Sequence, residues 1–103
     1  MNTIARWTTP LIAYRPSMAQ IEDITQIKCV LSQVGVDLIV KSLEDCTIED
    51  NRFVWALAQQ ESAMLASNRD TWLQFDYVTS SGARYTTLPV KYATVDSGTN
   101  EAM

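Results

Sequence analysis

Apolar and polar residues alternate along several stretches of this chain. The clearest alternation covers residues 26–32, 52–57 and 71–78. Because successive side chains of an extended strand point to opposite faces, a period of two indicates strands with one face in a core. In the second stretch Phe53, Trp55 and Leu57 share a face, which we expect to be buried.

Turn residues divide the rest of the chain. Gly35 and Gly82 predict hairpin turns, since glycine adopts the positive φ that tight turns need. Pro89 interrupts the last apolar run and predicts an edge position, a bulge or a break into two strands. Together these signals predict strands at residues 9–14, 26–34, 38–42, 47–48, 52–57, 71–79 and 84–95.

Two stretches do not alternate. Residues 59–66 are rich in helix formers and predict one short helical segment. Residues 18–24 are compatible with a helical turn for which Ser17 is the N-cap.

The spacing of these elements predicts the fold class. About seven short strands in one chain of 103 residues are typical of an all-β, immunoglobulin-like β-sandwich. A small Greek-key barrel is the main alternative. We expect residues 8–95 to form the single sandwich domain, residues 1–7 to be an N-terminal arm, and residues 96–103 to be a flexible acidic tail.

Composition narrows the function classes. The chain has no histidine, and its 8 basic and 12 acidic residues give a net charge of −4. Nucleic acid and anionic membrane surfaces are therefore unexpected partners, because both need clustered Lys and Arg. No Ser-His-Asp set, metal-ligand spacing or glycine-rich phosphate loop occurs, so we expect no enzyme and no cofactor. A carboxylate pair of Glu61 and Asp76 is the remaining catalytic alternative, and Asp76 is expected to be exposed.

The beginning of the chain and its cysteines bear on localisation. The first residues contain no apolar stretch typical of a signal peptide, so we expect folding in a cytoplasm. Cys29 and Cys46 are then expected to be reduced thiols. Cys29 shares a strand face with Ile27 and Leu31, which suits a small buried residue.

Three residues are candidates for contact with partners. Trp72 shares a strand face with Gln74, Asp76 and Val78, which is compatible with an exposed outer face or with packing under the predicted helical segment. Trp7 lies in the expected arm, and Pro10 opens the first strand. Aromatic residues are enriched at interfaces, so an exposed Trp72 would mark a contact surface. In the alternative interpretation, Trp72 with Tyr77 or Tyr85 would stack on sugars.

The order of short motifs resembles that of a known family. The motifs are TTP at residues 8–10, IKCVLSQ at 27–33, KSLEDCTI at 41–48, LAQQESAML at 57–65 and LQFDYVT at 73–79. They are similar to a family of small structural proteins of tailed bacteriophages and prophages of gut bacteria. That family typically has LTQEE where this chain has LAQQE, and a basic residue where this chain has Asp76.

The resemblance implies a non-enzymatic virion protein with a β-sandwich fold, in the head decoration, the tail or the neck. It implies contacts with other virion proteins and with copies of itself, assembly in the host cytoplasm, and no catalytic residues. A carbohydrate- or receptor-binding module is the alternative function.

Overall fold

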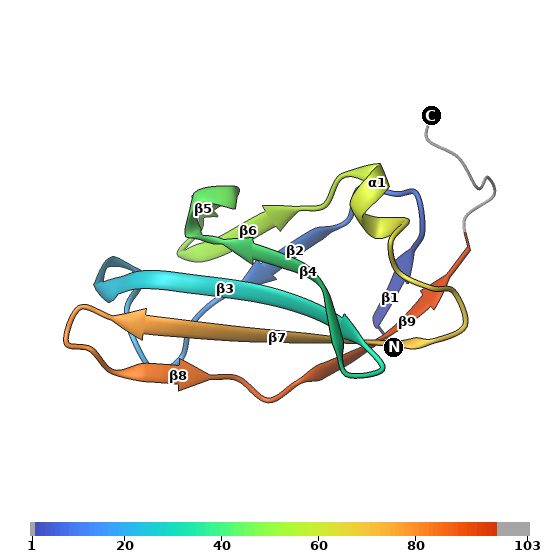
Figure 1. The fold of residues 1–103 in the computed structure, drawn as a ribbon. Helices are drawn as coiled ribbons and strands as arrows, with labels where there is room; N and C mark the ends of the chain where they lie inside the picture. Colours follow the sequence, from blue (N-terminus) through green and yellow to red (C-terminus); the bar gives the residue numbers. More distant parts are fainter. Residues whose placement is uncertain (1, 97–103) are drawn as a thin grey trace.

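The computed structural model describes residues 2–96, which form two packed β-sheets (Figure 1). The large sheet has the strand order β1-β9-β7-β3-β4, with β8 paired to β7, and the small sheet has the order β2-β6-β5. The nine strands of this region are β1 (Asn2–Ala5), β2 (Leu11–Tyr14), β3 (Ile24–Gln33), β4 (Val36–Ser42), β5 (Cys46–Glu49), β6 (Arg52–Ala56), β7 (Asp70–Thr79), β8 (Arg84–Thr86) and β9 (Val90–Val95).

Strands β3 and β7 form the centre of the large sheet. Each has ten residues, and they pair antiparallel with alternate side chains facing the small sheet. Cys29 lies opposite Phe75 in this pairing, and Leu31 lies opposite Leu73. All four side chains are buried, so the alternation in the sequence correctly predicted which face enters the core.

The small sheet supplies the other side of the core. Phe53, Trp55 and Leu57 are all buried, as expected. The Trp55 ring lies 5.6 Å from that of Phe75 in the opposite sheet, and Tyr14 stacks on Phe75 at 4.3 Å. The indole N–H of Trp55 donates a hydrogen bond to the carbonyl oxygen of Ser42 at 2.9 Å. Aromatic rings from both sheets therefore fill the middle of the sandwich.

The order of the strands confirms the immunoglobulin-like sandwich. Strands β2, β6 and β5 occupy the B, E and D positions of that fold, and β4, β3, β7 and β9 occupy C′, C, F and G. Cys29 and Cys46 are both free, so the architecture occurs here without the disulfide of antibody domains. The region has nine strands instead of about seven, because a break that includes Pro89 separates β8 from β9, and because β1 was not expected.

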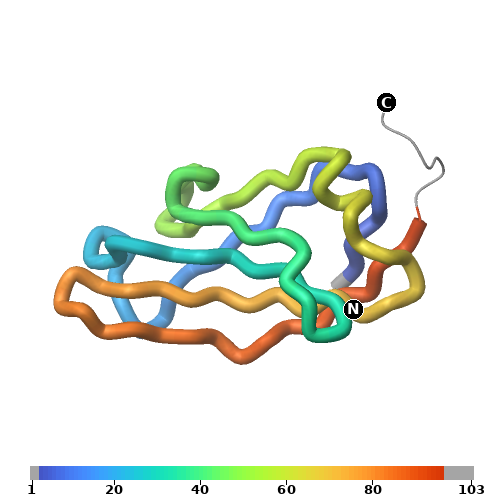
Figure 2. Tube along the Cα trace, viewed as in Figure 1, coloured from blue at the N-terminus to red at the C-terminus, as the bar shows by residue number. Residues whose placement is uncertain are grey.

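The N-terminal residues do not form the free arm that the sequence suggested. Asn2–Ala5 form β1, which pairs parallel with β9, and the two segments lie side by side in Figure 2. Ile4 is buried in the core. The segment is too short to show a period of its own, and β9 provides its partner from the far end of the chain. Asp96 is exposed after β9, and the rest of the expected tail lies outside the described residues.

The helical segments are shorter than expected. The helix α1 covers Gln59–Ser62, and a 3-10 turn covers Ile21–Asp23 with Gln20, not Ser17, in the N-cap position. A second 3-10 turn, Leu43–Asp45, connects the two sheets. Residues 63–69 between α1 and β7 are irregular, and Leu65 among them is buried.

The environments of the two thiols predict different reactivities. Burial raises the pKa of the Cys29 thiol to about 12, although Lys41 opposes the shift. Because the thiolate is the nucleophile, Cys29 is almost entirely in the unreactive thiol form at pH 8. Burial also raises the pKa of the half-buried Cys46 thiol, but less.

We therefore expect a thiol reagent at pH 8 to modify Cys46 alone in the folded protein, and Cys29 only after denaturation. Mass spectrometry of the labelled peptides measures this order. In a Cys46→Ser variant, the folded protein should show no fast reaction. Equal labelling of both thiols in the folded wild type would contradict this placement of Cys29.

Candidate interaction surface

The outer face of the large sheet carries an exposed tryptophan. Trp72 lies in β7, between Ser32 of β3 and Lys91 of β9, and its side chain is 39% exposed. In the neighbouring row, Val30 is half-buried and Val40 is 52% exposed. A rigid central strand thus presents an indole ring among valine side chains. We call the outer face of β3, β4, β7, β8 and β9 the sheet face.

Charged side chains lie next to these apolar residues. Lys28 and Lys91 are exposed cations on the sheet face, and Asp37 is an exposed anion at its β4 edge. Asp76 is half-buried, accepts a hydrogen bond from the Thr86 hydroxyl and lies 3.9 Å from Arg84. Apolar and charged side chains thus share this face, and both kinds of contact occur in protein interfaces.

The carboxylate pair considered from the sequence is not assembled. Asp76 points away from the core, whereas Glu61 of α1 forms an ion pair with Lys41 at 2.5 Å on the other side of the large sheet. Burial by itself raises the pKa of Glu61, but hydrogen bonds from the Ala58 N–H and Lys41 outweigh it and lower this pKa below its usual value. Each carboxylate therefore has its own local partners.

The sugar-stacking set is not assembled either. Tyr77 is buried in the core, and Tyr85, which lies opposite it on β8, packs on its ring at 5.3 Å. Trp72 is an odd number of residues from Tyr77 on the same strand, so the two side chains point to opposite faces. Trp72 is thus separated from both tyrosines that the carbohydrate hypothesis placed beside it.

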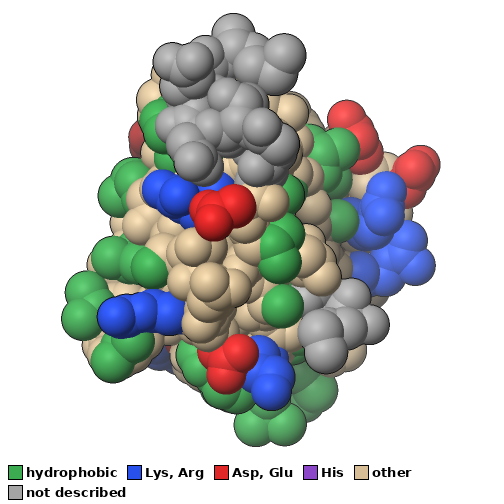
Figure 3. Space-filling view, turned by 90° about the vertical axis from the view of Figure 1, so that its right-hand side faces the viewer, with side chains coloured by type: hydrophobic (Ala, Val, Ile, Leu, Met, Phe, Trp, Pro, Cys, Tyr) green, Lys and Arg blue, Asp and Glu red, His purple; other side chains and the backbone are tan. Residues whose placement is uncertain are grey.

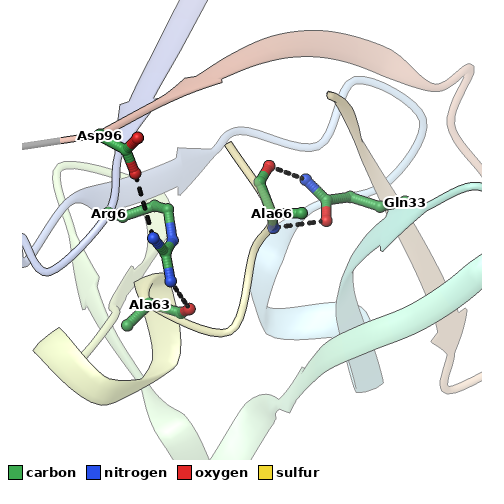
Figure 4. Close-up of polar contacts among 5 residues, drawn as sticks. All are labelled: Arg6, Gln33, Ala63, Ala66 and Asp96. Atoms are coloured by element: carbon green, nitrogen blue, oxygen red, sulfur yellow. Dashed lines mark hydrogen bonds and ion pairs between the residues drawn. The ribbon is translucent and has the colours of Figure 1, made fainter. Parts of the chain in front are cut away.

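At one end of the sandwich, polar contacts hold the connection between α1 and β7. The Gln33 amide donates to the Ala66 carbonyl at 3.0 Å and accepts from the Ala66 N–H at 2.8 Å (Figure 4). It also donates to the Thr71 hydroxyl at 2.9 Å, and Thr71 is hydrogen-bonded to Thr94. These pairs satisfy the buried polar groups, so this cluster serves the fold.

Arg6 contributes a second contact at the same end. Its guanidinium donates to the Ala63 carbonyl at 3.0 Å and forms an ion pair with Asp96 at 3.1 Å (Figure 4). Figure 3 views this end of the molecule and shows acidic and basic side chains side by side. The charges visible in that view therefore do not form a patch of one sign.

Trp7 and Pro10 lie in the connection that leads from β1 to β2. Both are half-buried. Trp7 has a φ of 63°, and the next residue, Thr8, is fixed to α1 because its backbone N–H and C=O both hydrogen-bond the Ser62 hydroxyl. The Pro10 carbonyl accepts a hydrogen bond from the Leu57 N–H, which extends the small sheet. Of the three contact candidates, Trp72 is the one on the sheet face.

A separate apolar hollow opens between β2 and β8. It has a volume of about 340 Å³, and its walls include Tyr14, Met18, Tyr85 and Leu88. No charged side chain lines it. It offers apolar contact but no group for acid–base chemistry.

Val30, Val40, Lys91 and Asp37 were not singled out from the sequence. A signal existed for Val30, which is an apolar residue between Lys28 and Ser32 on the polar side of its strand. Val40 gave no such signal, because the alternate residue Leu38 is also apolar. No such signal existed for Lys91 and Asp37. Their place in one row with Trp72 depends on the break before β9 and on a register shift between β3 and β4.

Within residues 2–96, no cluster of three or more His, Cys, Asp or Glu side chains could hold a metal ion. In the same region, no helix has the length and apolar character needed to cross a bilayer. Comparisons of this chain with protein-family models, with curated proteins and with solved structures found no match.

Proposed function

We propose that this protein is a non-enzymatic structural component of a bacteriophage virion, in the head decoration, the tail or the neck. It acts by protein–protein contact through the sheet face. The observation that carries the contact proposal is the exposed Trp72, which stands on the regular outer surface of the large sheet between β3 and β9. The virion setting rests on the motif resemblance.

A solvent-exposed indole ring on a regular sheet favours this kind of function. Tryptophan is among the residues that contribute most to interfaces, especially when an apolar centre is surrounded by a polar rim. Burying the exposed part of Trp72, on the order of 100 Å², would contribute about 2 kcal/mol to association. The neighbouring Val30 and Val40 extend the apolar area that a partner would cover.

The free thiols agree with this setting. A virion part that folds and assembles in the host cytoplasm meets a reducing environment, where disulfides rarely form. Cys29 and Cys46 lie in different sheets and are unpaired. Stacked aromatic rings fill the region between the two sheets, where antibody domains have a disulfide.

The proposal predicts that purified phage particles contain this chain and that its incorporation depends on Trp72. Particles would be prepared from the bacterium that carries the gene, and the chain quantified by mass spectrometry. We expect the wild-type chain in several copies per particle, and a Trp72→Ala chain reduced at least about tenfold, as for a central interface residue.

An Ile48→Ala chain is the matched control, because Ile48 is also an exposed apolar residue but lies in the small sheet. It should be incorporated as well as the wild type. Absence of the wild-type chain from particles would overturn the virion assignment. Equal incorporation of the two variants would overturn the assignment of the sheet face.

A further inference from the structure

The side chains on the sheet face complement themselves. We propose that two copies of this protein form a dimer through this face, related by a two-fold axis that runs parallel to the strands, between β3 and β7. The inference rests on the proposed function, in which the same face is the contact surface. It adds the identity of one partner, a second copy of this chain.

The pairing of strands arranges the exposed side chains in rows across the sheet. One row contains, from the β9 edge to the β4 edge, Lys91, Trp72, Ser32 and Asp37. The proposed axis places each row against the reversed row of the second copy. Lys91 then faces Asp37 of the second copy, and Trp72 faces the small side chain of Ser32, which leaves space for the indole ring.

A second row shows the same complementarity. It contains Thr86, Asp76, Lys28 and Ser42. When this row is reversed, Asp76 faces Lys28 of the second copy, and Thr86 faces Ser42. Both charged rows therefore meet with opposite signs under one axis, and by symmetry each contact occurs twice.

The row between these two is mainly apolar. It contains Gln74, Val30 and Val40 on β7, β3 and β4. On the other side of Gln74 lies the break between β8 and β9, where the Thr87 carbonyl accepts a hydrogen bond from the Gln74 side chain. Under the proposed axis, Val40 faces this break on the second copy. Leu88 is 86% exposed in the single chain. The dimer would cover the apolar side chains at both ends of this row, Val40 at one end and Leu88 at the other.

Lys91 and Asp37 cannot satisfy each other within one chain. They stand on β9 and β4, three strand spacings or about 14 Å apart. Within residues 2–96 neither forms an ion pair, and the same holds for Lys28. A second copy brings the opposite charge to each of them.

The size of the face sets the expected affinity. Four strands about 4.8 Å apart and about seven residues long present roughly 450 Å² in projection. A standard interface buries about 800 Å² from each partner, so we expect dissociation in the micromolar range.

Charge reversal tests the arrangement directly. We expect sedimentation across a concentration series at low salt to show a wild-type dimer. Lys91→Glu and Asp37→Lys should each weaken it at least about tenfold, because each puts like charges together at two symmetric places. An equimolar mixture of the two variants should dimerise again. In the mixed dimer the two substituted positions face each other with opposite charges, and the native pair remains on the other side.

Glu22→Lys is the control, an exposed charge reversal in the turn before β3 that should leave dimerisation unchanged. Circular dichroism verifies that every variant is folded. A wild type that stays monomeric at millimolar concentration, single variants that dimerise like the wild type, or a mixture that stays monomeric would each overturn the dimer. None of these results changes whether the chain and its Trp72 are needed in particles, so the proposed function is decided separately.

Discussion

Replacing Trp55 by alanine should lower the free energy of unfolding by about 3–5 kcal/mol, the largest loss we expect from one substitution. The side chain is fully buried and packs on Phe53 and Phe75 in the middle of the sandwich. Its removal leaves a cavity that both sheets border, and the rigid strands cannot close it. Because a domain of this size is stable by about 5–15 kcal/mol, the variant should fold only marginally. Urea denaturation followed by circular dichroism measures the loss.

Trp72→Ala is the matched control for that loss. The residue type and the change are identical, but Trp72 is on the outer face and 39% exposed. We expect a loss of about 1 kcal/mol, mainly from the lower strand propensity of alanine. Trp55→Phe should fall between the two, because it keeps most of the ring volume and loses the hydrogen bond to Ser42. Similar losses for the two alanine variants would contradict the placement of Trp55 in the core.

Replacing Gln33 by leucine should cost about 2–3 kcal/mol and loosen the connection before β7. Gln33 is 4% exposed and makes three hydrogen bonds, two to the backbone of Ala66 and one to Thr71. Leucine has a similar volume but neither donates nor accepts, so these partners lose bonds in a site with little water. Hydrogen exchange should speed up over residues 63–70 in the variant.

Gln26→Leu provides the comparison, since Gln26 is exposed on the same strand. A surface substitution of this kind should change stability by less than about 0.5 kcal/mol and leave the exchange of residues 63–70 unchanged. If both glutamine variants were as stable as the wild type, the Gln33 amide would not be what holds this connection.

The parts of the fold that could be predicted are those that depend on residues close together in the sequence. Alternation within β3, β6 and β7 is a property of neighbouring residues, and it identified the buried faces that include Cys29, Trp55 and Phe75. Pro89 lacks a backbone donor, so the break in the last run could also be expected. By contrast, β1 exists because β9 accepts it as a parallel neighbour from the other end of the chain.

The candidate contact residues also differ in how far the sequence could predict their surroundings. Exposure of Trp72 was one of two alternatives that the sequence allowed, because Gln74 and Asp76 on its side of the strand are polar, and the structure confirms it. The positions of Trp7 and Pro10 could not be predicted, because Thr8, next to Trp7, is bonded to Ser62 and Pro10 is bonded to Leu57, both more than forty positions away. An N-terminal arm was therefore expected where the chain is in fact fixed to the domain.

The sequence by itself determined an all-β sandwich and its core faces, because side-chain period and turn chemistry act over a few residues. It left two positions open for Trp72, the outer face or a place under the helical segment, and the structure shows the outer face. Only the tertiary structure decided which charges meet around that tryptophan. Lys91, Trp72, Ser32 and Asp37 come from four strands, and they form one row because of a strand break and a register shift. The register between neighbouring strands depends on the packing of the whole core, so no pattern within one strand determines it.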